Sequence, residues 1–315
     1  MSALLGPALV LVFTLSQAFR DVFFGAVFQR VSFFAVIVLT FTLSTLIFGV
    51  VTLIRSPGDF RKLRGQGGTV LAVNLFTAGA WSNFFFALQY LDPSIVNTVH
   101  SAMGPLVVLG LGFFGVSLAQ RTATNWVERI GYAGIALSVV ALWIVVVGGH
   151  AGLATKTLSA SVTGLALLMV SGASITVSLL YCKRLQDRGI GADTVTTVRY
   201  VALILLCAGL WWWGGRPAGI DTFAQLSTLS LAALILIILP LYAFQVGIGR
   251  VSPLTANVIR ALGPVFVFAL EQFDGRIRYS AAVLGCILVY SASVILSNLA
   301  RGWREEAPRA VSVSR

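Results

Sequence analysis

Long apolar stretches dominate this sequence, and they leave few folds open to it. Ten of them reach the roughly 17–25 residues that a helix needs to cross a bilayer. They fall near residues 4–24, 32–54, 68–90, 94–115, 128–149, 159–182, 193–214, 227–248, 254–273 and 279–299. Of the 315 residues, 57% are hydrophobic and only 10% are charged, whereas about a quarter of a soluble domain is charged. The sequence therefore predicts an all-α polytopic membrane protein with ten transmembrane helices in a lipid bilayer.

The basic residues lie mainly in the predicted loops. A net charge of +11 would suggest nucleic-acid binding in a soluble protein, but here the charges follow the positive-inside rule. With a cytoplasmic N-terminus, the inner loops and the tail hold fourteen Lys and Arg residues, and the outer loops hold five. We therefore expect both termini in the cytoplasm, the cell inner (plasma) membrane as the location, and no nucleic-acid partner.

Neither a targeting signal nor a metal site is expected. Residues 1–5 contain no Lys or Arg, so the first apolar run is read as a membrane helix rather than a secretory signal peptide. Cys182, Cys207 and Cys286 are far apart and lack metal-binding or redox spacing, which favours packing roles. No cofactor is expected.

Two segments, 92–109 and 251–268, repeat one pattern. Each has an opening proline, an asparagine four residues on, a basic residue three further, and then a Gly-Pro pair with a long apolar run. The pairs, Gly104-Pro105 and Gly263-Pro264, lie 159 residues apart, about half the chain. Duplicated halves are typical of membrane transporters.

The repeat predicts two five-helix halves, residues 1–152 and 153–300, followed by a cytoplasmic tail, 301–315. Five is an odd number of crossings, so the second half enters the membrane from the opposite side. The expected architecture is an inverted five-plus-five repeat.

This pattern resembles the EamA-like branch of the drug/metabolite transporter superfamily over essentially residues 4–300. The resemblance rests on 87–94 running into the first Gly-Pro pair and 249–253 running into the second. It implies a secondary carrier of small metabolites with a central cavity lined by both halves. One departure is that 116–120 lacks the glutamate with which the family often ends this helix, while Glu271 and Asp274 stand at shifted spacing in the second half.

The first helix carries two polar stripes at i, i+4 spacing, Ser16 with Arg20 and Gln17 with Asp21. Charged residues inside spans usually face a cavity or a partner. We assign Ser16 and Arg20 to substrate binding and Asp21 to proton coupling. The alternative is that both charges lie at the interface and extend to water.

The fourth predicted helix contributes Asn97 and His100 as substrate-binding candidates. A histidine titrates near neutral pH, so His100 is also a candidate for proton coupling. The alternative for His100 is a buried neutral ring satisfied by one hydrogen bond.

The ninth predicted helix carries Arg260 about 10 Å from its start, too deep to reach water easily. We expect Arg260 to anchor an anionic substrate group, with Asn257 on the same face. If the helix is continuous, Glu271 falls within about 20° of that face. Glu271 is a candidate for a proton relay, or it pairs with Arg276 or Arg278.

Aromatic and amide side chains at mid-depth suit a pocket for an organic solute. The substrate-binding candidates of this kind are Trp81, Asn83, Tyr242 and Gln245. Pro240 frees a carbonyl in its helix, which makes it a hinge candidate. Arg199, six residues into its helix, is expected to extend to the cytoplasmic surface.

These residues predict a secondary transporter of small organic metabolites, amino-acid-like or otherwise carboxylate-bearing, that works by alternating access with proton coupling or exchange. ATPase and hydrolase motifs are absent from the sequence, so enzymatic activity is not expected. Two alternatives stay open. One is a membrane-embedded enzyme for lipid-linked substrates, and the other is a non-transporting assembly or sensor protein. A homodimer also stays open.

Overall fold

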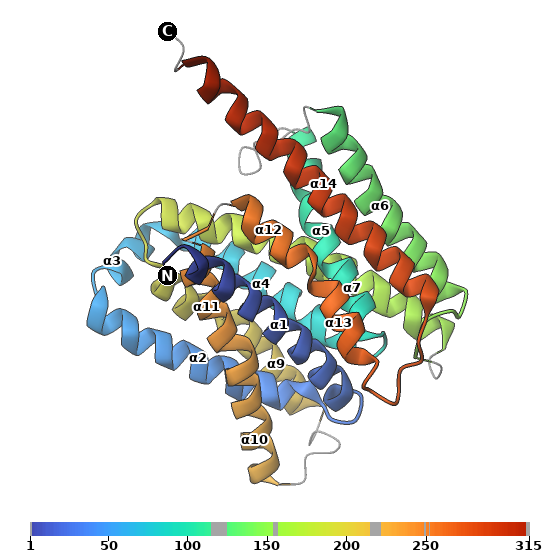
Figure 1. Ribbon diagram of the computed structural model, residues 1–315. Helices are drawn as coiled ribbons and strands as arrows, with labels where there is room; N and C mark the ends of the chain where they lie inside the picture. The colour runs from blue at the N-terminus through green and yellow to red at the C-terminus, as the bar shows by residue number, and fades with distance from the viewer. Residues whose placement is uncertain are drawn as a thin grey trace.

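The computed structural model describes residues 2–114, 125–153, 157–214, 222–248, 250–251 and 253–312, all helical or in turns and connections (Figure 1). The first half contains α1 (Ser2–Phe28), α2 (Phe33–Arg55), α3 (Asp59–Leu63), η1 (Arg64–Gln66), α4 (Gly67–Leu88), α5 (Pro93–Phe113) and α6 (Trp126–Val147). The second half contains α7 (Leu158–Asp187), α8 (Ala192–Val198), α9 (Val201–Trp213), α10 (Phe223–Ala233), η3 (Leu234–Ile238), α11 (Leu239–Ile248), α12 (Pro253–Ala261), α13 (Gly263–Glu271) and α14 (Ala281–Ser312).

Within the described part of the chain, nine helices are long and apolar enough to cross a membrane. They match nine of the ten predicted spans. The remaining span, 254–273, is divided into α12 and α13, each nine residues long. The prediction of an all-helical polytopic membrane protein is therefore confirmed, while the prediction of one continuous ninth helix is wrong.

The surface suits lipid rather than water. Large apolar side chains such as Leu46, Ile54 and Leu137 are exposed on several helices, which a soluble protein would avoid over so wide an area. Trp212 and Trp213 at the end of α9 are also exposed. That position agrees with the aromatic belt at a membrane interface.

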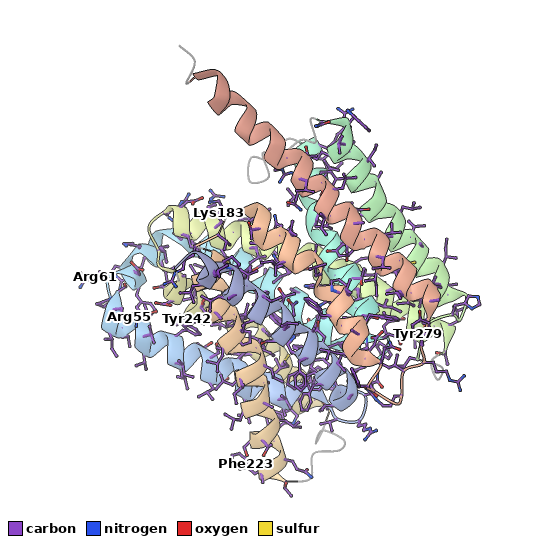
Figure 2. The ribbon with its side chains drawn as sticks, viewed as in Figure 1. Arg55, Arg61, Lys183, Phe223, Tyr242 and Tyr279 are labelled. Carbon is purple, nitrogen blue, oxygen red and sulfur yellow. The ribbon has the colours of Figure 1, made fainter. Side chains whose placement is uncertain are left out.

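Three basic residues from two of the predicted inner loops lie on one side of the bundle. Arg55, Arg61 and Lys183 lie on the left side of Figure 2, whereas Phe223 lies at the bottom and Tyr279 at the right. The free ends of α1 and α14 also point to the upper left (Figure 1). These three residues, which the sequence predicts to face the cytoplasm, therefore lie on the side towards which both helix ends point.

Helix packing is tightest between α4 and α7 and between α6 and α14. In the second pair, a Cβ atom added to Gly131 would lie 2.6 Å from Cβ of Ser297. The missing side chain allows the two helices to approach, as expected for small residues in membrane bundles. Arg301 of α14 also donates to Glu128 of α6 at 2.6 Å. These contacts join the last helix of the first half to the last helix of the second half.

Three interruptions fall in second-half helices. The first separates α8 from α9 at Arg199 and Tyr200, and the second is the π-helical turn η3. Pro240, which lacks an N–H group, follows that turn closely, so a wider turn is tolerated there. The third is Leu262, between α12 and α13. In contrast, α5 continues through Pro105.

Asn74 of α4 bridges the first interruption. Its Nδ2 donates to the Val198 carbonyl at 2.8 Å, and its Oδ1 accepts from the Ala202 N–H at 3.0 Å. A continuous helix would bond those two groups to each other, because they are four residues apart. The Asn74 amide therefore satisfies two backbone groups that the break exposes.

Candidate functional site

A buried ion pair lies in the second half of α1. Arg20 Nε donates to Asp21 Oδ1 at 2.7 Å, and Asn97 of α5 donates to Asp21 Oδ2 at 2.6 Å. Arg20 is 5% exposed and Asp21 is 0% exposed. The alternative that these charges extend to interfacial water is therefore wrong. We call these three residues the Arg20 cluster.

Aromatic rings enclose the Arg20 guanidinium. Its Cζ lies 5.5 Å from the Trp81 ring and 5.3 Å from the Phe84 ring. Cations are attracted to the faces of such rings, most strongly where water is excluded. The buried Trp81 Nε1 has no hydrogen-bond acceptor among the described residues, so it can donate to a ligand in this region.

His100 of α5 lies beside the same rings, 5.0 Å from Phe84 between ring centres. The Ser171 hydroxyl donates to the Ala80 carbonyl at 2.7 Å and lies 3.0 Å from His100 Nδ1. A hydroxyl has one proton, so Nδ1 must be the donor in the second contact. In the neutral ring Nε2 is then left as an acceptor.

Arg260, at the end of α12, has no acidic partner among the described residues. No hydrogen bond or ion pair joins its guanidinium to another described residue, and its Cζ lies 5.2 Å from the Phe244 ring. Its charge acts on His100 and on Tyr290 of α14. The side chain is exposed although protein surrounds it. Arg260 is therefore accessible from outside the protein.

The other polar groups near Arg260 come from α5 and α14. The Ser101 side chain interacts with Tyr290, and Ser291 donates to the Ala261 carbonyl at 2.8 Å beside the helix break. Asn257 donates to Asn298 at 3.1 Å, so its amide bridges α12 and α14. The structure thus gathers Arg260, His100 and Tyr290 around one region.

Glu271 pairs with none of the described arginines. The Ser94 N–H donates to it at 3.0 Å and the Ser94 hydroxyl at 2.6 Å. The expected pairing with Arg276 or Arg278 is wrong. Arg276 instead pairs with Asp274 and donates to Gln29 at 2.6 Å, and Arg278 bonds through its backbone to Gly152.

The shared helix face expected for Arg260 and Glu271 is also wrong. That expectation required a continuous helix, and Leu262 interrupts it. Glu271 lies close enough to Asp92 and Asp274 to feel their charges, but each carboxylate is occupied by its own donors. Among the described residues, His, Cys, Asp and Glu form no group of three or more that could hold a metal.

Asp92, between α4 and α5, was not among the predicted site residues. It accepts from the Gly152 N–H at 2.7 Å and the Leu153 N–H at 2.9 Å. Burial raises the pKa of its carboxyl to about 6, although both backbone bonds act in the opposite direction. An aspartate before a proline normally predicts a cap for its own helix, so its bond to a distant connection could not be read from the sequence.

The remaining predicted residues are dispersed. Ser16 is half-buried on α1, and Asn83 donates to the Gly79 carbonyl of its own helix at 2.6 Å. Tyr242 lines a separate small cavity. The side chain of Gln245 lies outside the described residues. Phe84, Ser171 and Tyr290 join the site without having been predicted, because nothing in their own spacing marks them.

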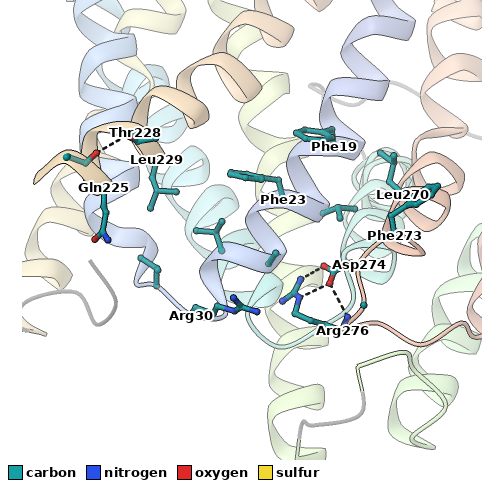
Figure 3. Close-up of a pocket in the computed structure, with 16 residues that line it drawn as sticks. Phe19, Phe23, Arg30, Gln225, Thr228, Leu229, Leu270, Phe273, Asp274 and Arg276 are labelled. Atoms are coloured by element: carbon teal, nitrogen blue, oxygen red, sulfur yellow. Dashed lines mark hydrogen bonds and ion pairs between the residues drawn. The ribbon is translucent and has the colours of Figure 1, made fainter. Parts of the chain in front are cut away.

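A second feature, a groove of about 1060 Å³, lies between α1, α10 and the end of α13 (Figure 3). Phe19, Phe23 and Leu229 contribute to its apolar wall, and Arg30 and the Asp274–Arg276 pair lie at one end. Arg20 is not among the lining residues. The groove is therefore distinct from the buried cluster.

Comparison with known proteins supports the fold alone. Neither a family model nor a curated protein matches the chain. One solved structure, described only as "Crystal structure of protein", matches with a TM-score of 0.60 at 17% sequence identity. The likeness covers 95% of this chain and 96% of that one. At this identity the likeness establishes a shared fold and gives no information about substrate or activity.

Proposed function

We propose that this protein is a secondary transporter of small organic anions, and that Arg260 anchors the substrate's carboxylate. The observation that carries the proposal is the contrast between two arginines. Arg20 is neutralised by Asp21 at 2.5 Å, whereas Arg260 has no acidic partner among the described residues and is exposed. A guanidinium stays charged at this depth and holds a carboxylate through two parallel hydrogen bonds.

The surroundings of Arg260 suit an amino-acid-like or other carboxylate-bearing solute. Phe244 and Tyr290 supply aromatic surface, and Trp81 offers a free N–H donor near the neighbouring Arg20 cluster. A mixture of apolar walls and few polar groups is typical of small-molecule sites. His100, with Nε2 as an acceptor, is the group proposed to carry a coupled proton, and Asp21 is the second candidate.

The inverted repeat is part of the proposal, and the helix contacts support it. The proposed symmetry exchanges α1 with α7, α2 with α8–α9, α4 with α10–α11, α5 with α12–α13, and α6 with α14. Under that exchange, the contact of α4 with α7 corresponds to that of α11 with α1, and α5 with α7 corresponds to α12 and α13 with α1. The pairs α5–α13 and α6–α14 map onto themselves. The family proposal, an EamA-like drug/metabolite transporter, agrees with this pattern.

Alternating access follows from the same arrangement. At the end predicted to face outwards, Glu271 binds Ser94 and Asp92 binds Gly152, and the Arg20 cluster is sealed from water. Arg260, on the half of the bundle predicted to face the cytoplasm, is accessible. We assign this conformation to an inward-accessible state, in an inner membrane with both termini cytoplasmic.

The test begins with a thermal-shift screen of the purified protein against carboxylate-bearing metabolites, because a ligand that binds the folded state raises its melting temperature. Ligands that stabilise the protein are then followed into proteoliposomes containing wild type, Arg260→Lys or Arg260→Ala. Lysine cannot reproduce the pair of parallel hydrogen bonds, and alanine removes them. The free energy of substrate binding should therefore weaken by about 2–3 kcal/mol in either variant, while both variants still insert into the membrane.

The matched control is Arg55→Lys, since Arg55 is an exposed arginine at the end of α2. It should transport as wild type does. Normal transport by both Arg260 variants would place the anchor elsewhere. Failure of both variants to fold would make Arg260 a structural residue and would overturn the assignment.

A further inference from the structure

A small enclosed cavity lies beside the break between α8 and α9. It measures about 10 Å³, and its wall includes Phe48, Thr196, Arg199, Tyr200, Ile238 and Tyr242. The cavity is therefore bounded by α2, by the interrupted seventh span and by the region around η3 and α11. A space of this size holds one water-sized particle.

Arg199 brings an uncompensated charge to this cavity. The residue is 8% exposed, and its Nε is buried without a hydrogen-bond acceptor. Its expected extension to the cytoplasmic surface is therefore wrong. The guanidinium stacks on Tyr200, 5.2 Å from Cζ to the ring centre, but no carboxylate pairs with it in the described part of the chain. Its titratable neighbours are Tyr200 and Cys182, a phenol and a thiol.

A second source of positive potential converges here. The thirteen-residue helix α9 starts at Val201, directly after Tyr200. The free N–H groups and the dipole of a helix N-terminus favour an anion. Asn74 occupies only one of those donors, the Ala202 N–H. Tyr200, the residue before α9, lines the cavity, so the start of this helix lies beside the buried guanidinium. Burying such a charge without a counter-ion is costly.

The cavity is distinct from the proposed substrate site. Tyr242 lines it, whereas Phe244, two residues on, contacts Arg260. Residues two apart on a helix point about 200° apart, so the two arginines lie against opposite faces of α11. The cavity is also too small for a carboxylate-bearing metabolite, which requires several heavy atoms.

We propose that this cavity binds a single chloride ion, held by Arg199 and the N-terminus of α9. The ion neutralises the guanidinium and joins α2, α9 and α11 at the position where the seventh and eighth spans are interrupted. It is a structural anion, bound independently of the transported solute.

The experiment compares melting temperatures in sodium chloride and in sodium gluconate at equal ionic strength. Unfolding is followed with a thiol-reactive dye, since Cys182, Cys207 and Cys286 are all buried and unpaired by disulfides. Chloride should raise the melting temperature of the wild type by a few degrees, with a saturable dose dependence, and bromide should do the same. Arg199→Gln should lose this response, whereas Arg55→Gln and Arg260→Ala should keep it.

Equal melting temperatures of the wild type in the two salts would mean that the cavity holds water only, and the proposal would fail. A full chloride response in Arg199→Gln would place the ion elsewhere and would overturn it equally. Wild-type crystals grown in bromide supply a measurement that needs no variant. An anomalous peak beside Arg199 is the expected result, and its absence there counts against the site even if Arg199→Gln does not fold.

Discussion

The carboxylate of Glu271, at the last residue of α13, accepts the backbone N–H of Ser94 at 3.0 Å, near the start of α5. Pro93 begins that helix and has no N–H, so Ser94 carries its first free donor. Glu271 therefore caps a helix of the other half of the chain, and this contact connects α13 to the start of α5.

Removing this cap should weaken the junction. We expect Glu271→Ala to lower the free energy of unfolding by about 1–3 kcal/mol, because the Ser94 N–H and hydroxyl lose their acceptor. Thermal unfolding followed through the buried cysteines measures the change. Gln272→Ala is the control, since that residue is exposed and bonds only within its own helix end. Equal melting temperatures for the two variants would contradict a capping role.

Asp92 should make stability depend on pH. Its pKa is about 6 in the folded protein and 3.8 ordinarily, so the folded state binds more protons between those values. Stability should therefore fall as the pH rises from about 4 to 6, by up to about 3 kcal/mol in total. In Asp92→Asn this part of the dependence of stability on pH should disappear. The stability of the variant relative to the wild type should therefore increase as the pH rises.

The measurement is the melting temperature of both proteins between pH 4 and 8. The neighbouring Glu271 is present in both, so its own titration contributes to both curves. Asp187→Asn, which removes an exposed carboxylate, is the comparison and should keep the wild-type slope. A slope that survives in Asp92→Asn would assign the effect to another group.

Asn74 should stabilise the fold, although it is a polar residue inside a membrane span. Asn74→Ala removes one donor and one acceptor from the break between α8 and α9, and should cost about 2–3 kcal/mol. Asn83→Ala is the matched control, because Asn83 bonds only to a carbonyl of its own helix. If the two variants are equally stable, the Ala202 N–H must have closed onto the Val198 carbonyl, and α8 and α9 would form one helix.

Topology can be tested with single cysteines in a variant lacking the three native ones. A cysteine replacing Lys156 should react with a membrane-impermeant thiol reagent on intact cells, and one replacing Lys62 should react only after the membrane is opened. The reason is the excess of basic residues in the loops on the side of Lys62. Labelling of the Lys62 position alone would reverse the proposed orientation.

Much of the architecture can be predicted from the local sequence. Long apolar runs have to satisfy their backbone groups internally, so they form helices, and Pro93 marks where α5 begins. The internal repeat and the loop charges likewise need no coordinates to be seen. The depth of Arg260 and the choice of His100 as a candidate also came from the sequence, because ionisable residues are rare in such runs.

Which polar groups meet was decided only by the tertiary structure. The sequence does not reveal that Asp21 is held by Asn97, that Glu271 reaches Ser94, or that Asn74 divides α8 from α9. These partners lie tens to hundreds of residues apart, and a polar side chain in a membrane can be satisfied by whichever helix packs beside it. The sequence determined which residues must find partners. The packing of the helices determined that Arg260 and Arg199 would find no carboxylate in the described part of the chain.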